Sequence, residues 1–376
     1  MGISWTYKDI TPSTATKTID DFVKQTEDIG IVPILNLSTA SKKYPSDESA
    51  WKSFIQKTVD RYDGDGKNDM PNLKNPIKYW HVIQEWKVHW EGTAEEYTAF
   101  LNMTNDVIKE EDASAKVILV GLATRDMEYA VYKYNLVKTP MPTDLMEKPG
   151  REDEITYILK NGKYDIVDFH SYEKKYFVSA KVKLLRSVYK ISNPIWVMEA
   201  GGPFIKKSEG YTDEKNAQFL IKQYAQAFAS GIDRYIWALN APKSGGVWDY
   251  EPWTNMPLLD TQKNKKPSFY TFDILTKKLS GFTGVEDLSI KNNGAENEDT
   301  YVFKFNKQDK PIYILWADMG AKYNISLSGS GESKILVTYP ITTHGKTTPE
   351  TKIFLSENGS VSLDLTTNPI FAEEIN

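Results

Sequence analysis

Short apolar runs alternate with amphipathic stretches from the start of the chain to about residue 280. The runs are rich in β-branched and aromatic residues and lack the alternation of a half-exposed sheet, which predicts strands buried on both faces. The predicted strands span residues 31–37, 79–83, 117–122, 166–169, 195–198 and 235–239. The predicted helices between them span residues 16–29, 48–62, 94–109, 152–160, 180–189, 214–230 and 268–279. Regular alternation of this kind is typical of βα units around a parallel sheet.

Local signals mark the ends of several predicted helices. Asp47 and Thr93, each followed closely by Glu, have the character of N-caps, while Gly30 and Gly231 lie where helix C-caps belong. No glycine-rich dinucleotide fingerprint follows any strand, so the one-way βα order favours an α/β (β/α)8 barrel over a doubly wound sheet. A complete barrel needs eight strands, and even with a strand stub at residues 3–7 only seven are found. We therefore expect the first βα unit to be missing, through truncation, a misassigned start or a genuine deletion.

The pattern changes after Phe282. Short alternating runs separated by turn residues follow, such as TYVFKFN, IYILWAD and KILVTYP, and the step from Glu357 to Gly359 is a hairpin signal. Residues 283–376 are therefore predicted to form an antiparallel β-sandwich, and residues 1–282 the barrel domain.

The composition excludes several classes of function. The net charge of −5 argues against a nucleic-acid binder, and no run of apolar residues is long enough for a membrane span. The absence of cysteine excludes thiol catalysis, and only four histidines remain for an imidazole metal site. The first twelve residues lack the pattern of a signal peptide, which leaves the compartment undecided. The 22 tyrosines and 10 tryptophans provide abundant stacking surface.

Two glutamates directly follow predicted strands, where the active site of a parallel barrel forms. They are Glu85, after the run YWHVI, and Glu199, after IWVM. A carboxyl group at the edge of an apolar core is harder to ionise and can donate a proton near neutral pH. Glycoside hydrolases cleave the glycosidic bond with two carboxyl groups that face each other across it. Either glutamate alone is equally well explained as a solvated strand end or as the partner of a nearby cation.

The order of these motifs resembles a known group of enzymes. Tyr-Trp, three residues and Gln-Glu follow IVPILNLS, and then come IVDFHSY, PIWVMEAGGP and RYIWALN. This order is similar to that of the retaining glycoside hydrolases of clan A, the (β/α)8 clan that contains cellulases, mannanases and β-xylosidases. The resemblance runs from about residue 15 to the C-terminus, because these enzymes also carry a trailing sandwich.

The resemblance implies roles for individual residues. Glu85 would be the general acid/base and Glu199 the nucleophile, on a carbohydrate substrate and without a required cofactor. Gln84 occupies the position where the clan usually has an Asn that contacts the sugar 2-hydroxyl, and Trp86 the position where Pro is frequent. These departures indicate an outlying family with its own substrate.

Other polar and aromatic residues near the strand ends are candidate substrate contacts. Tyr172 would donate to the nucleophile, while His170 is either a site residue or a satisfied core histidine. Trp237 would either form the base of the sugar-binding pocket or pack in the core. Asn36 could form a hydrogen bond with a hydroxyl group of the sugar. Aromatic or imidazole side chains in loops after strands are expected to wall the subsites: Trp86, His89, Trp90, Trp248 and Trp253.

A loop with closely spaced carboxylates lies at Asp63, Asp65 and Asp69. This spacing and its glycines are found in calcium loops, although Lys74 occupies the position where an EF-hand requires Glu. A structural calcium ion and a solvated Asp/Gly turn both explain the loop.

Two alternatives to a hydrolase stay open. The chain could be a catalytically silent carbohydrate-binding barrel, which Gln84 and the missing first unit favour. A barrel isomerase or aldolase fits less well, because no lysine ends a strand and no phosphate-binding glycine loop follows the late strands.

Overall fold

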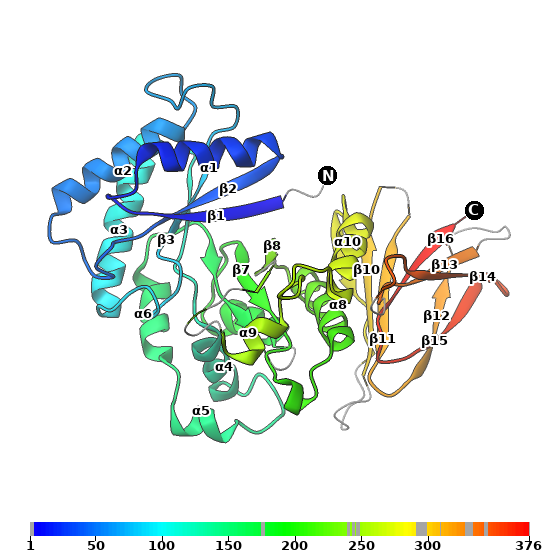
Figure 1. Cartoon of the computed structure of the whole chain (residues 1–376). Helices are drawn as coiled ribbons and strands as arrows, with labels where there is room; N and C mark the ends of the chain where they lie inside the picture. The colour runs from blue at the N-terminus through cyan, green and yellow to red at the C-terminus, as the bar shows by residue number, and fades with distance from the viewer. Residues whose placement is uncertain are drawn as a thin grey trace.

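The first part of the chain forms parallel strands joined by helical connections (Figure 1). The computed structural model describes residues 4–173, 177–238, 241–242, 245, 249–290, 299–308, 310–327, 334–341 and 345–375. A four-stranded parallel sheet has the order β1 (Ser4–Ile10), β2 (Ile31–Leu37), β3 (Tyr79–Val82) and β4 (Lys116–Ile118). A second parallel group contains β5 (Val167–Asp168), β6 (Ser171–Tyr172), β7 (Ile195–Gly201) and β8 (Arg234–Trp237).

The two groups continue into one another. Parallel bridges join Ile118 to Ile166 and Leu122 to Phe169, so β4 lies next to β5. Within the described part of the chain, β1 pairs only with β2, and β8 only with β7. The parallel strands therefore form an arc in chain order, and a closed eight-stranded barrel remains a prediction.

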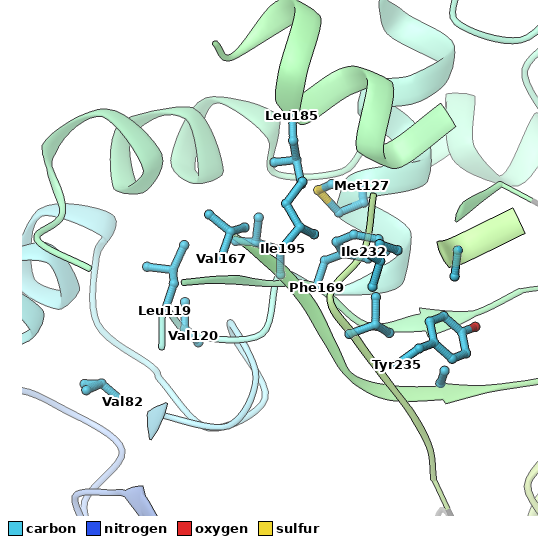
Figure 2. Packing of buried hydrophobic residues seen from close by; sticks show 14 of the residues in the cluster. Val82, Leu119, Val120, Met127, Val167, Phe169, Leu185, Ile195, Ile232 and Tyr235 are labelled. Carbon is cyan, nitrogen blue, oxygen red and sulfur yellow. The ribbon is translucent and has the colours of Figure 1, made fainter. Parts of the chain in front are cut away.

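The two faces of the arc bury different sets of side chains. A small inner cluster brings together residues of β2, β4 and β7 and the residue that precedes β5: Ile34, Ile118, Trp196, Met198 and Ile166. Since these strands are not all neighbours, the sheet must curve so that side chains of distant strands meet on its inner face. The outer face packs against the helices, and Figure 2 shows Leu185 reaching from its helical segment to Ile195 and Val167 on the strands.

The helices that cover the outer face begin and end close to the predicted positions. They are α1 (Thr16–Asp28), α2 (Glu48–Tyr62), α3 (Ala94–Glu111), α6 (Glu152–Asn161), α7 (Val178–Lys183), α8 (Asp213–Ala229) and α10 (Pro267–Leu279). The predicted N-caps are confirmed, because Asp47 accepts a backbone N–H at 2.9 Å and Thr93 forms a reciprocal capping box with Glu96. Gly30 and Gly231 take the positive φ of a helix C-cap.

Three short helices were not predicted: α4 (Thr124–Lys133), α5 (Thr143–Glu147) and α9 (Glu251–Asn255). In α4 the buried face includes Asp126, which accepts the backbone N–H of Arg151 at 3.0 Å. A buried carboxylate interrupts the apolar periodicity that identifies a helix. The predicted helix over residues 180–189 is split, since Leu184–Val188 forms a π-turn after α7.

The C-terminal part is antiparallel. A six-stranded sheet has the order β14 (Glu350–Leu355), β13 (Lys334–Tyr339), β16 (Ile370–Ile375), β11 (Ile312–Ala317), β10 (Thr300–Asn306) and β9 (Gly284–Asp287). A two-stranded sheet contains β12 (Ala321–Ser326) and β15 (Ser360–Leu365). Val302, Leu315, Ile325, Val337 and Leu363 share one core, so the two sheets pack face to face as a sandwich.

The other face of the six-stranded sheet packs on the first part of the chain. Phe303, Phe305, Trp316 and Phe371 belong to the same hydrophobic cluster as Leu220 of α8, and α8 and α10 stand beside this sheet (Figure 1). Because the core is continuous across this junction, the division at residue 282 remains a prediction. None of the described helices is long and apolar enough to cross a membrane.

Candidate active site

Glu85 and Glu199 lie at the same end of the parallel strands. Glu85 comes three residues after β3, and its backbone forms a parallel bridge with Gly121, beyond β4. Glu199 lies within β7, where the register with β8 shifts between Val197 and Ala200. A bulge of this kind re-aims the side chains around it. Glu199 is thereby placed against side chains from the segments after β3 and β5.

The imidazole of His170 lies between the two glutamates. Its Nδ1 is 3.4 Å from Oε2 of Glu85 and 3.7 Å from Oε2 of Glu199. These two carboxylate oxygens are therefore separated by at most the sum of the distances, about 7 Å, whereas retaining pairs have roughly 5 to 5.5 Å between carboxyl groups and inverting pairs roughly 6.5 to 9.5 Å. The distance between the two glutamate carboxylates is therefore short enough for a glycoside hydrolase of either type.

Glu199 accepts hydrogen bonds from two other side chains. The hydroxyl of Tyr172 donates to Oε2 at 2.9 Å, and the side-chain amide of Gln84 donates to Oε1. Glu199 is 8% exposed. Two donors aimed at a buried carboxylate stabilise its negative charge, which is the state that a nucleophile needs.

Backbone strain is found on both sides of Glu85. Ile83 has a φ of 68°, in the left-handed region that a β-branched residue rarely adopts, and Lys87 has a φ of 61°. Such a conformation costs about 1–3 kcal/mol and persists only where the surrounding structure holds it. Here the turn at Ile83 ends β3 and lets Gln84 reach across to Glu199.

A second layer of buried polar groups lies against His170. Oδ2 of Asp168 is 3.6 Å from Nε2 of His170 and 3.5 Å from Nε2 of His81, and all three side chains are at most 2% exposed. Burial by itself would lower the pKa of His170, but the surrounding carboxylates, Glu199 foremost, raise the pKa of His170 well above its ordinary value. Burial lowers the pKa of His81.

Two of the remaining candidate residues also lie on strands. Asn36 is buried on β2, in register with His81, and donates to the carboxylate of Asp9 and to the hydroxyl of Ser38. Trp237 ends β8 as the register partner of Ala200, is 6% exposed, and its Nε1 has no hydrogen-bond partner among the described residues. The sugar-binding roles of Asn36 and Trp237 remain predictions.

The tryptophans after β3 do not line the site. Trp86 and Trp90 are completely buried, and both pack edge-on against Tyr97 of α3. The indole N–H of Trp86 donates to Glu154 of α6 at 3.0 Å. The prediction that Trp86 and Trp90 wall a subsite is therefore wrong, because helix α3 provides an apolar surface that covers them.

Another set of aromatic rings does extend outward from the site. Trp253 lies edge-on to Tyr172 with ring centroids 4.8 Å apart, and Phe204 follows at 4.9 Å from Trp253. Tyr250 continues the row at 5.9 Å from Phe204 and is 45% exposed. Trp248, the other predicted wall, lies outside the described residues.

The candidate calcium loop lies at the opposite end of the strands, between α2 and β3. One carboxylate oxygen each of Asp63, Asp65 and Asp69 lies within 4.8 Å of the others. The same carboxylates accept backbone N–H groups of their own loop, and Lys78 donates to the backbone oxygen of Asp63 at 3.0 Å. These contacts hold the turn together without a cation, and a structural calcium ion remains a prediction with no part in catalysis.

Three residues of this site were not expected from the sequence: His81, Gly121 and Asp168. A signal for Asp168 was present, because Asp168 ends an apolar run two residues before His170, and in an extended segment residues two apart share one face. Nothing in the sequence pointed from His81 to this pair.

The fold is that of known glycoside hydrolases. A glucosidase from Croceicoccus marinus superposes with a TM-score of 0.65 at 14% identity, over 97% of this chain and 83% of that one. A family 39 glycoside hydrolase from Bacteroides cellulosilyticus gives 0.63 at 13% identity, over 98% and 75%. A family 30 endoxylanase from Clostridium papyrosolvens gives 0.59 at 13% identity, over 99% and 89%.

The likeness lies in the structure rather than in the sequence. No protein-family model matches the sequence, and no curated protein matches it at a significant level. The chain therefore shares its α/β fold with parallel strands and a C-terminal antiparallel sandwich with solved glycoside hydrolases of families 39 and 30.

Proposed function

We propose that this protein is a retaining glycoside hydrolase. The observation that carries the proposal is the convergence of Glu85 and Glu199 on one atom, Nδ1 of His170, at 3.4 and 3.7 Å. A separation of at most about 7 Å on a fold that known glycosidases share admits double displacement, and the choice of the retaining mechanism follows from the resemblance to clan A.

In this mechanism Glu199 attacks the anomeric carbon while Glu85 protonates the leaving oxygen. The resulting glycosyl-enzyme carries an ester at Glu199, and Glu85 is left as a carboxylate. Glu85 then takes a proton from water, which attacks the anomeric carbon and releases Glu199. The hydrogen bonds from Tyr172 and Gln84 hold Glu199 ionised and oriented before the attack.

We propose an oligosaccharide or polysaccharide as the substrate. The row of Trp253, Phe204 and Tyr250 leads from Tyr172 to the surface. Aromatic faces pack against the C–H groups of sugar rings, so this row would hold sugars beyond the one that is cleaved. A glucosidase, an endoxylanase and a β-xylosidase among the structural neighbours make glucosides, xylan and β-xylosides the first substrates to test.

The test uses aryl β-xylosides, aryl β-glucosides and xylan with the native protein and with Glu199→Gln and Glu85→Gln. We expect turnover by the native protein, retention of anomeric configuration in the first product seen by proton NMR, and loss of about a thousandfold or more in both variants. Full activity of Glu199→Gln would overturn the assignment, and an inverted first product would overturn the mechanism.

One observation favours a sugar-binding protein without activity. The amide of Gln84, which in the clan would be an Asn contacting the sugar 2-hydroxyl, is instead bonded to Glu199. If the native protein binds xylan in affinity electrophoresis but hydrolyses no glycoside, this second function replaces the first. Gln84→Asn would then be the variant in which to look for activity.

A further inference from the structure

Asp168 takes no part in the chemistry proposed above, although it is completely buried against His170. We propose that Asp168 is a positioning residue that keeps His170 protonated, so that the imidazolium stabilises the negative charge on whichever of Glu85 and Glu199 carries it. The catalytic consequence rests on the proposed function, whereas the protonation of His170 rests on the geometry alone.

The two nitrogens of His170 face acidic groups on opposite sides of the ring. Nε2 faces Asp168 at 3.6 Å, and Nδ1 faces Glu85 and Glu199 at 3.4 and 3.7 Å. A neutral imidazole has one N–H and one lone pair, so one side would place a lone pair against a carboxylate. The imidazolium, with an N–H on each nitrogen, presents a donor to Asp168 on one side and to the ionised Glu199 on the other.

Asp168 is anchored for this role. Its Oδ1 accepts the backbone N–H of Met198 on β7 at 2.8 Å, which directs Oδ2 toward the two imidazoles. His81 lies 3.5 Å from the same oxygen, and burial lowers the pKa of His81. Of the two imidazoles that face Asp168, His170 is therefore the one that holds the second proton.

The position of His170 fits the movement of charge in double displacement. Before the attack, the negative charge is on Glu199. In the glycosyl-enzyme Glu199 is a neutral ester, and Glu85 has given its proton to the leaving group and become the carboxylate. Because Nδ1 is about equally far from both oxygens, one fixed donor serves both states, and His170 keeps its own proton throughout.

Other groups that face His170 complete its electrostatic surroundings. The ring of Tyr172 is edge-on to the imidazole at 6.4 Å, and the ammonium of Lys181, from α7, is 3.4 Å from the backbone oxygen of His170. Neither supplies a negative charge at the imidazole. Replacing Asp168 by Asn removes one of the three carboxylates around the ring while keeping an oxygen for the N–H of Met198.

The first experiment reads the protonation directly and needs no substrate. The chain has four histidines, so the ring-nitrogen signals of histidine labelled with ¹⁵N can be assigned by NMR with the variant His170→Asn. We expect both nitrogens of His170 to be protonated at pH 7 in the native protein, and the midpoint to fall by about one pH unit or more in Asp168→Asn. A His170 that is neutral at pH 7, or an equal midpoint in both proteins, would overturn the proposal.

The second experiment follows the pH dependence of kcat/KM on an aryl glycoside. In Asp168→Asn we expect the alkaline limb to move to lower pH by about one unit, since His170 then loses its proton earlier. The matched control is Asp126→Asn, a carboxylate that is 1% exposed and also accepts a backbone N–H. An equal shift in both variants, or no shift in Asp168→Asn, would leave Asp168 with a structural role only and contradict the proposal. If the native protein hydrolyses no glycoside, the proposed function fails, and the NMR titration still decides the protonation.

Discussion

Gly121 lies so close to His170 that no other residue fits at its position. A Cβ on Gly121 would come within 2.3 Å of Nε2 of His170 and within 2.6 Å of the backbone oxygen of Gln84. Real Cβ atoms do not approach other atoms so closely. The lack of a side chain after β4 thus lets the imidazole lie between Asp168 and the two glutamates.

Replacing Gly121 by Ala is therefore expected to displace the imidazole of His170. Because a shift of about 1 Å at a reacting centre can cost about a hundredfold, we expect kcat/KM on an aryl glycoside to fall by about ten- to a hundredfold. Gly284→Ala is the control, since a Cβ there meets nothing within 4 Å. Circular dichroism checks that both variants fold. If Gly121→Ala keeps the kcat/KM of the native protein, the position of the His170 imidazole does not depend on the missing side chain at Gly121.

The hydrogen bond from Tyr172 to Glu199 predicts a second effect. Tyr172→Phe keeps the ring and removes a donor that lies 2.9 Å from the carboxylate. A hydrogen bond to a charged group is worth about 1.5–3 kcal/mol, so kcat/KM should fall by about ten- to a hundredfold with little change in thermal stability. Tyr157→Phe, at a residue that is 37% exposed on α6, should leave the kinetics unchanged. Equal kinetics in both variants would rule out a catalytic use of the Tyr172 hydroxyl.

The segment that carries His170 and Tyr172 is followed by a buried ion pair. Nζ of Lys181 lies 2.6 Å from Oε1 of Glu173, and both side chains are completely buried. Lys181→Met would leave a buried carboxylate uncompensated, which should lower the free energy of unfolding by about 3–5 kcal/mol in a urea titration. Adding Glu173→Gln removes the orphaned charge and should restore part of the loss. A double variant as unstable as Lys181→Met would contradict this electrostatic account.

Lys222 of α8 should make stability depend on pH. It is 5% exposed beside the ring of Trp316, and burial lowers its pKa from 10.5 to about 8, partly opposed by the charge of Asp318. Between these two pH values the unfolded chain holds a proton that the folded chain has released. The stability due to this group therefore rises with pH from about 8 to about 10.

Lys222→Met should abolish that rise and increase the free energy of unfolding at pH 7 by about 1–3 kcal/mol. The measurement is a set of urea titrations at pH values from 7 to 10. Lys57→Met, at an exposed position on α2, is the control and should leave the pH dependence as it is. A loss of stability at pH 7 in Lys222→Met would show that the contacts with Trp316 and Asp318 outweigh the cost of burying the charge.

Much of the site was visible in the sequence because the signals are local. A buried strand is an apolar run, and the residue that follows such a run lies at the strand end, so Glu85 and Glu199 could be located from the alternation of elements alone. The contact between Tyr172 and Glu199 agrees with the role expected from the motif order. Trp86 was misassigned because no local sequence signal shows that its ring packs against α3 or that Glu154, 68 residues further along the chain, accepts its indole N–H.

By itself, the sequence determined the order of strands and helices, the caps, the change to alternating strands after Phe282 and the two strand-end glutamates. These features depend on periodicity and on neighbours a few residues away. Only the tertiary structure decided the bulge at Glu199, the burial of Trp86 and the meeting of Asp168 with His170 and the glutamates. The physical reason is that charges on separate strands interact through space, and their distances depend on how the whole sheet curves.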